Sequence, residues 1–357
     1  MKAHIPVVQD PVVDAIAFVL PWGVDLPQDE QTQNVSPLLR RLNNEIENGE
    51  CERAYPRGGR YRDSVRIHFE KRHHALVQIG AVRPDNQKGG IRISVNPSRF
   101  IHGDVEHLHT FMKRVVGREY TKLLSSALLN RVDFAVDVHH ADLNRMLVSY
   151  DHAQHRTIFA KRVTSAGRIE GYNFGSVKSD YMTTAYDKRG ERIHAAIVNL
   201  LKYGKGNDEL RDNAIKQLER ERDSHEVIRI EVRGKKLRGL PLWDLGSLPN
   251  RFARFHFADL SRGGTELSEF DKAVFHSMSQ QLGVRAALAL FKNTSQSRQV
   301  LQYWKSHQAS WWNPGPLWAD ACRAMRETGL FHAQAFERPK VRNLASPSVS
   351  KRDMPPG

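Results

Sequence analysis

Apolar and polar residues alternate along several short segments of this chain. The alternation is clearest at 131–138 and 227–233, and it recurs at 65–69 and 91–95. Successive side chains of a β-strand point to opposite faces, so a period of two predicts a strand with one buried face and one wet face. We therefore expect a sheet that contains these four segments. Further strands are predicted at 15–20, 168–175 and 180–187.

Other segments have helical spacing. Val105, Leu108, Met112 and Val115 recur at intervals of three and four residues after Asp104, a residue suited to capping a helix. Leu143, Met146, Leu147 and Tyr150 would share one face of a short helix. From residue 242 onward the patterns are helical, with no clear strand. Helices are thus predicted at 37–47, 104–115, 119–129, 143–150, 208–222 and repeatedly within 242–335.

These patterns predict an α+β fold. A central antiparallel sheet would have helices on one face, and a mostly helical C-terminal part would follow. Pro, Gln, Asn, Arg and Gly are frequent before residue 64, and Pro, Ser, Arg and Lys are frequent after residue 337. We divide the chain accordingly into an N-terminal extension (1–64), a mixed α/β domain (65–236), a helical domain (242–335) and a disordered tail (337–357).

Charge narrows the class of partner. The 357 residues carry a formal net charge of +14, with a pI of about 9.8. This balance favours an anionic partner, nucleic acid first and an acidic membrane surface second. Cys51 and Cys322 are the only cysteines, which excludes a disulfide scaffold or a zinc finger. Because no stretch reads as a signal peptide or a membrane span, we expect a cytoplasmic protein with no membrane partner.

The polar faces of two predicted strands carry carboxylates among arginines. In the first strand these residues are Arg131, Asp133 and Asp137; in the second they are Arg229, Glu231 and Arg233. Asp133 and Asp137 lie roughly 13 Å apart along one strand, so a single ion would take one of them plus Glu231. Oxygen ligands suit Mg²⁺ or Mn²⁺. We place the ion at Asp133 and Glu231, with Asp137 as the alternative to Asp133. A solvated face with ion pairs would show the same pattern.

Two tyrosines lie in segment 172–191. Tyr181 and Tyr186 are five residues apart, so on one strand they point to opposite faces. A phenol has a pKa of about 10 and is a poor nucleophile at neutral pH unless a cation favours its ionised form. Lys188 shares the parity of Tyr186 and is placed either to lower the pKa of the phenol or to steady the phosphate. Tyr186 is therefore the predicted nucleophile for attack on a DNA phosphate, Tyr181 is the alternative, and both are also common strand residues.

Three ordered blocks resemble the Rep_trans-type replication initiation factors, the rolling-circle replication initiators of filamentous phages and plasmids. The blocks are Arg131-Val132-Asp133 through Asp137, Gly175-Ser176-Val177-Lys178-Ser179 through Tyr186-Asp187-Lys188, and Arg229-Ile230-Glu231. The resemblance implies an enzyme that nicks one DNA strand through a 5′-phosphotyrosine and later rejoins it. It also implies a fold related to the HUH endonucleases, with 65–236 as the nicking and joining domain.

The resemblance also implies partners. The substrate would be a replication origin, contacted through Arg131, Lys178, Arg229 and Arg233. Because a Walker A loop is absent, the helicase would come from the bacterial host, as would the DNA polymerase. A homodimer is one option for the assembly. The His-hydrophobe-His triplet that binds metal in HUH enzymes occurs here only at 107–109, within a helical pattern, where residues two apart do not share a face.

A non-catalytic, sequence-specific DNA-binding regulator of a phage or plasmid is the alternative function. Segment 280–304 could form two helices around Lys292-Asn293-Thr294, similar in outline to a helix-turn-helix that would read DNA. A regulator would leave DNA intact without metal, whereas an initiator would need a divalent ion and leave a nick. Both would bind DNA in a salt-sensitive way.

Overall fold

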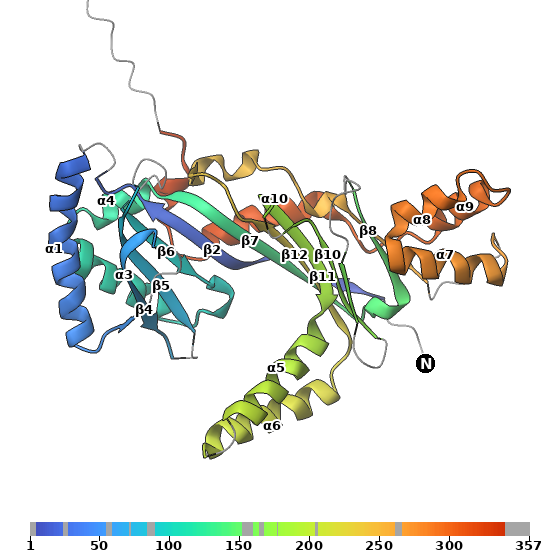
Figure 1. Cartoon of the computed structure of the whole chain (residues 1–357), viewed down its shortest axis with the longest axis horizontal. Coiled ribbons are helices and arrows are strands. Elements are labelled where there is room, and N and C mark those ends of the chain that lie inside the picture. Colours follow the sequence, from blue (N-terminus) through green and yellow to red (C-terminus); the bar gives the residue numbers. More distant parts are fainter. Residues whose placement is uncertain are drawn as a thin grey trace, which may run out of the picture.

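A computed structural model shows the fold of this chain. Within the residues that it describes, the chain has an α+β fold built on one large antiparallel sheet, with a helical C-terminal part (Figure 1). The predicted fold class is thus confirmed. The residues described are 5–23, 28–54, 59–70, 73–83, 90–151, 160–163, 168–176, 178–203, 206–260 and 266–339.

The large sheet has the strand order β3-β4-β5-β6-β2-β7-β12-β11-β10-β9, and β1 and β13 add to β7. β2 lies between β6 and β7, so residues assigned from sequence to the N-terminal extension supply a strand in the middle of the sheet. The strands are β1 (Val7–Val8), β2 (Val12–Leu20), β3 (Glu52–Arg53), β4 (Tyr61–His68), β5 (His74–Ala81), β6 (Ile91–Val95), β7 (Leu128–His139), β9 (Ala160–Val163), β10 (Ile169–Phe174), β11 (Tyr181–Asp187), β12 (Val227–Gly234) and β13 (Leu240–Pro241).

Helices and short 3₁₀ turns connect and cover these strands. The helix predicted at 119–129 is shorter than expected, because β7 already begins at Leu128. The α-helices are α1 (Gln28–Glu47), α3 (Asp104–Val116), α4 (Tyr120–Ser125), α5 (Lys188–Tyr203), α6 (Asp208–Arg222), α7 (Glu269–Leu282), α8 (Val284–Phe291), α9 (Ser297–Ser306) and α10 (Pro314–Glu327). The 3₁₀ helices are η1 (Pro97–Arg99), η2 (Leu143–Arg145), η3 (Leu242–Ser247), η4 (Phe252–Arg254) and η5 (Ala333–Phe336).

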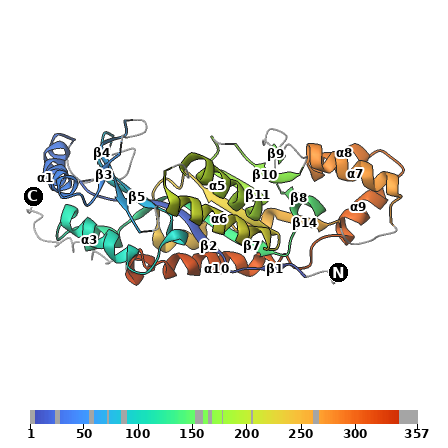
Figure 2. The same cartoon turned by 90° about the horizontal axis from the view of Figure 1, so that it is seen from below.

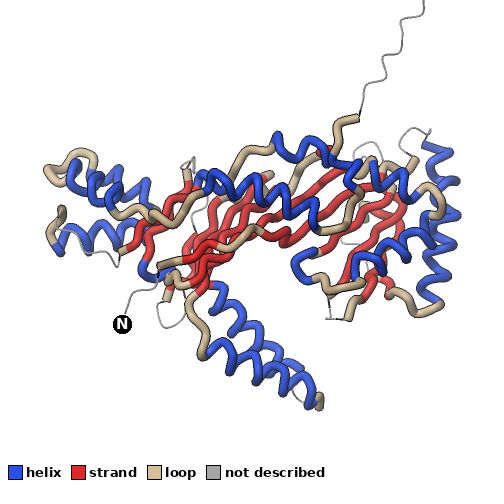
Figure 3. The backbone as a smooth tube through the Cα atoms, turned by 180° about the vertical axis from the view of Figure 1, so that it is seen from behind, coloured by secondary structure: helices blue, strands red, loops and turns tan. Residues whose placement is uncertain are grey.

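The apolar face of the sheet packs against helices. Val132, Phe134 and Val136 of β7 are fully buried on this face, and the ring of Phe134 meets Trp318 of α10 edge-on at 5.5 Å. Each such buried side chain stabilises the fold by about 1.5–3 kcal/mol relative to an exposed one. From behind, helices cross in front of the strands (Figure 3), and α10 runs along the sheet (Figure 2). The α5–α6 hairpin instead projects from the end of β11 (Figure 1).

The helix predicted at 143–150 is wrong. Met146–Tyr150 form β8, which pairs with β14 (Phe255–Asp259) in a separate two-stranded sheet. Met146 and Val148 join the main core, whereas Leu147 joins a second core. A strand buried on both faces has apolar residues in succession, and over so few residues that pattern also matches a helix.

The C-terminal part contains strands as well as helices, so the prediction that 242–335 has no strand is wrong. β14 takes its partner from β8, more than 100 residues earlier, and no local pattern marks that pairing. α7, α8 and α9 surround the second core, which includes Phe275, Val300 and Tyr303. Met325 of α10 belongs instead to the main core.

Of the tail predicted to be disordered, residues from 340 onward lie outside the described residues. Among the described residues, no helix combines the length and the apolar character needed to cross a membrane.

The glycine and the two serines of the Gly-Ser-x-x-Ser motif have structural roles in the turn between β10 and β11. Gly175 has a φ of +94°, and a Cβ built there would lie 3.0 Å from the carbonyl oxygen of Tyr181. The Ser179 hydroxyl donates to the carbonyl of Ser176, and the Ser176 hydroxyl accepts from the amide of Lys178. These contacts hold the turn, which sets the register of β11 against β10.

We predict that Gly175→Ala lowers the free energy of unfolding more than Gly49→Ala does. Both positions have a positive φ, which costs an L-residue about 1–2 kcal/mol. Only at Gly175 does the new methyl group also meet backbone, since nothing lies within 4 Å at Gly49. Urea unfolding of the two variants measures the difference. Equal losses would show that the turn yields without strain.

Candidate functional site

Polar side chains of three neighbouring strands meet on the face of the sheet opposite the α10 helix. β12 pairs with β7 on one side and with β11 on the other. The three sequence blocks, far apart along the chain, therefore lie side by side. Across the strands, Arg233 is paired with Asp133, Glu231 with Ala135 and Thr184, and Arg229 with Asp137 and Tyr186.

Tyr186 and Glu231 form the centre of this face. The Tyr186 hydroxyl donates to Glu231 Oε1 at 2.7 Å, and Arg233 Nε donates to Glu231 Oε2 at 2.8 Å. Glu231 is 3% exposed and Tyr186 is 8% exposed. We call these three residues, with Arg131, Asp133, Asp137 and Arg229, the arginine–carboxylate cluster.

The pKa of Tyr186 is raised above its ordinary value. Burial is the largest cause, and the negative charge of Glu231 and the hydrogen bond to it add to the effect. The pKa of Tyr186 is thus raised, whereas the sequence led us to expect that Lys188 would lower it; a role for Lys188 at the phosphate stays a prediction. Lys188 Nζ lies 5.8 Å from the centre of the Tyr186 ring, but it forms an ion pair with Glu191. The tyrosine is neutral at neutral pH, with its proton directed at a carboxylate.

Asp133 and Asp137 each have an arginine partner. Arg131 Nε lies 3.0 and 3.1 Å from the two carboxylate oxygens of Asp133, which is 1% exposed. Arg229 donates to both oxygens of Asp137, at 2.6 and 2.7 Å. Burial raises the pKa of Asp133, Arg131 opposes this, and Glu231 adds to it. The choice between Asp133 and Asp137 as the partner of Glu231 at an ion therefore stays a prediction.

A divalent ion would compete with these arginines. Both oxygens of Asp133 accept from Arg131, and Glu231 accepts from Tyr186 and Arg233. In the part of the chain that the structure describes, no group of three or more His, Cys, Asp or Glu side chains is placed to hold a metal ion. The residues therefore do not fit a metal ion in this arrangement. An ion at Asp133 and Glu231 would have to displace Arg131 and Arg233.

The four residues predicted to contact DNA lie in two different places. Arg131 and Arg233 lie at the open side of the cluster, with side chains 41% and 29% exposed, while Arg229 is 13% exposed. Lys178 is exposed in the β10–β11 turn, where its carbonyl accepts from Lys236. Within the cluster, Arg131 and Arg233 are therefore the arginines open to a phosphate. Lys178 lies outside the cluster.

Sequence reasoning missed Asp14. Its carboxylate lies 3.5 Å from Arg229, in a part of β2 where the register against β7 shifts between Val13 and Ala15. A bulge turns a side chain toward a face that simple alternation does not assign to it. Asp14 gives Arg229 a second acidic neighbour beside Asp137.

Tyr181 lies on the other face of β11, as its spacing from Tyr186 predicts. Its register partner is Gly234, three pairs from Glu231, and the guanidinium of Arg251 lies 3.9 Å from the centre of its ring. The structure therefore places Tyr186, and not Tyr181, in the arginine–carboxylate cluster.

The histidine triplet at 107–109 lies inside α3, as predicted. Its two rings turn to different neighbours: His107 meets the ring of Phe69, and His109 Nδ1 lies 2.7 Å from the Tyr120 hydroxyl. They cannot act together as the ligand pair of an HUH site.

We predict that Tyr186→Phe changes how stability depends on pH. The raised pKa means that this tyrosine stabilises the fold fully below about pH 10, and that this contribution is lost as the pH rises toward the folded-state value. The variant should lose about 1–3 kcal/mol at neutral pH, because Glu231 loses a buried donor. Its stability should then fall less steeply than that of the native chain at alkaline pH.

Urea unfolding at a series of pH values from about 8 to 11 checks this prediction. Tyr181→Phe is the matched control, since it removes a phenol from the same strand but not from the cluster. Parallel curves for the native chain and Tyr186→Phe would contradict the raised pKa of Tyr186.

Comparison with known proteins adds no relative. No protein-family model matches the chain, and no curated protein is similar enough to count as a match. The resemblance to replication initiators consequently depends on the three motif blocks.

Proposed function

We propose that this protein is a rolling-circle replication initiator that nicks one DNA strand through a covalent bond to Tyr186 and later rejoins the strand. One observation carries the proposal. A tyrosine hydroxyl donates to a buried carboxylate, Glu231, on a sheet face that also carries arginines. A carboxylate in that position can accept the phenol proton, and arginines can bind the phosphate that the phenol attacks.

The nicking step can be written with the side chains of the arginine–carboxylate cluster. The Tyr186 oxygen attacks the phosphorus while its proton passes to Glu231 Oε1. The bond from phosphorus to the 3′ oxygen breaks, and that oxygen takes a proton from water to become a 3′ hydroxyl, while Glu231 returns its proton to the solvent. The raised pKa of Tyr186 favours transfer of the proton during attack over ionisation beforehand. Rejoining is the reverse, with the 3′ hydroxyl attacking the phosphotyrosine.

The arginines supply the positive charge. Arg131 and Arg233 are the more open of the three cluster arginines, and each reaches the cluster from its own strand. Charge held in place near a phosphate stabilises the negative charge that develops during attack. Dependence on Mg²⁺ or Mn²⁺ remains a prediction of the resemblance, and the steps above do not pass through an ion.

The helical module offers a second contact with DNA. The two helices predicted around residues 292–294 are confirmed as α8 and α9. Segment 272–319 contains five Lys or Arg residues and no Asp or Glu. α9 exposes Arg298, Gln302 and Lys305 on one side, which are side chains suited to phosphates and base edges. We assign origin reading to this helix, and we take host helicase and polymerase as the partners that extend the 3′ end in a bacterial cell.

The nicking proposal predicts a covalent product. The native chain with Mg²⁺ or Mn²⁺ should convert a supercoiled plasmid that carries the DNA flanking its own gene into nicked circles. Protein should remain on the 5′ end, and a parallel reaction with EDTA shows whether the ion implied by the resemblance is needed. Tyr186→Phe should abolish the product, and Tyr181→Phe should retain nicking. The readout is a gel with and without protease treatment.

Two results would contradict this mechanism. Loss of the product only in Tyr181→Phe would move the nucleophile to the other face of β11. Intact plasmid that is tightly bound by every variant would favour the regulator, which binds DNA without cutting it.

Origin reading by α9 makes a separate prediction. Arg298→Ala should weaken binding to the flanking DNA by about 1–3 kcal/mol and weaken binding to unrelated duplex less, if the side chain contacts a base edge. Arg323→Ala is the control, because this arginine lies on α10 and pairs there with Asp320. A gel-shift titration at fixed salt measures both. Equal losses on the two DNAs would limit Arg298 to phosphate contact.

A further inference from the structure

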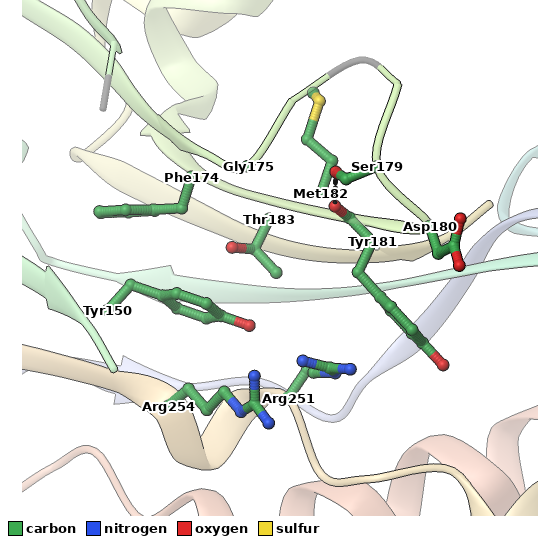
Figure 4. Close-up of a pocket in the computed structure, with 10 residues that line it drawn as sticks. All are labelled: Tyr150, Phe174, Gly175, Ser179, Asp180, Tyr181, Met182, Thr183, Arg251 and Arg254. Carbon is green, nitrogen blue, oxygen red and sulfur yellow. Dashed lines mark hydrogen bonds between the residues drawn. The ribbon is translucent and has the colours of Figure 1, made fainter. Parts of the chain in front are cut away.

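A pocket opens on the other side of β11 from the arginine–carboxylate cluster. It has a volume of about 460 Å³ and lies between the β10–β11 hairpin, β8 and η4. Tyr150, Phe174, Tyr181, Thr183, Arg251 and Arg254 line its walls (Figure 4). Cavities of this size hold ligands of a few hundred daltons.

One wall of the pocket is aromatic. The rings of Tyr150 and Phe174 lie nearly parallel, with centres 5.3 Å apart and 26° between their planes. Tyr181 stands on the opposite side of the space, and the Tyr150 hydroxyl end reaches toward the arginines (Figure 4). Flat rings of this kind stack with planar aromatic ligands, including nucleobases.

The other wall is cationic, and its charge is not neutralised by neighbours. No described carboxylate lies within ion-pair distance of Arg251 or Arg254, and the buried Nε of Arg251 has no hydrogen-bond partner among the described residues. Asp180 also lines the pocket, but Lys236 and Arg238 lie 3.2 and 3.5 Å from its oxygens. The arginines of the cluster, by contrast, all have carboxylate partners. The guanidinium of Arg251 lies over the Tyr181 ring, but no described carboxylate neutralises Arg251 or Arg254, so both keep N–H donors for an anion.

A buried hydroxyl completes the site. Thr183 is 1% exposed and lines the pocket, and its Oγ1 has no partner among the described residues. An unpaired buried polar group destabilises the protein. A ligand with a hydrogen-bonding edge would satisfy this hydroxyl.

We propose that this pocket binds one nucleotide unit of single-stranded DNA. The base would stack on Tyr150 and Phe174, the Thr183 hydroxyl would bond its polar edge, and Arg251 and Arg254 would hold its phosphate. A base in a duplex is stacked and paired, so only an unpaired base can enter. The inference rests on the proposed function in taking DNA as the polymer. Because β11 carries Tyr186 on one face and this pocket on the other, the pocket would hold the strand that opening of the origin makes available.

The test is binding of a labelled single strand of about sixteen thymidines, measured by fluorescence anisotropy in the Tyr186→Phe background, where no cleavage is needed. The double variant Arg251→Gln with Arg254→Gln should lower the affinity at least about tenfold at low salt. If both arginines contact phosphate, the slope of the logarithm of the binding constant against the logarithm of the salt concentration should also become shallower, by roughly 0.7 for each lost contact. Thr183→Val should lower the affinity about threefold to tenfold without loss of thermal stability, since it removes an unpaired hydroxyl.

Matched measurements separate the sources of binding. Arg118→Gln removes one exposed charge from the α3–α4 loop and should leave the affinity unchanged. Thymidine monophosphate should compete with the strand, and inorganic phosphate at the same concentration should not. Equal competition by phosphate would reduce the pocket to an anion site. An equal loss of affinity for a duplex of the same length would show general electrostatics. Either result would overturn the inference.

The two proposals can fail separately. If the pocket variants bind the single strand like the background protein while the native chain still nicks DNA, only the pocket assignment is wrong. If single-strand binding depends on the pocket but no nicked product forms, only the nicking proposal is wrong.

Discussion

The alternation of side chains along β7 is the constraint on which the rest of the structure depends. Phe134 and its apolar neighbours are buried under α10, and a strand repeats every two residues. Asp133 and Asp137 must therefore point to the opposite face. A slip of one residue would bury both carboxylates beneath the helix and expose the core, so register and site geometry are set together.

Ion pairs between arginines and carboxylates determine which groups on that face are open to a ligand. Asp133 and Glu231 are almost fully buried, and a buried charge without a partner is costly. Arg131, Arg229 and Arg233 supply the partners, which stabilises the face but also occupies the carboxylate oxygens. Under the proposed function, a DNA phosphate and the carboxylates would share the same guanidinium groups, so binding would rearrange ion pairs that already exist.

β11 links two different surfaces. Tyr186 faces the buried carboxylates, whereas Tyr181 faces a pocket with aromatic and unpaired cationic walls. The turn at Gly175 sets its register against β10, and the Asp187 carboxylate accepts from the Gly190 amide where α5 begins. The residues that resemble a catalytic motif therefore also hold the strand in place, which is why several of them have structural partners.

Strand patterning, charge and motif order could be read from the sequence alone. The alternation at 131–138 and 227–233 fixed the faces of both strands, and the spacing of the tyrosines fixed their opposite directions, because these properties are local. Tertiary structure decided the rest. The neighbours of β12, the partner of β8, the bulge at Asp14 and the proton acceptor of Tyr186 all depend on contacts between distant segments. The direction of the Tyr186 pKa followed from burial beside Glu231 and not from the nearby Lys188, since burial is a property of the folded chain.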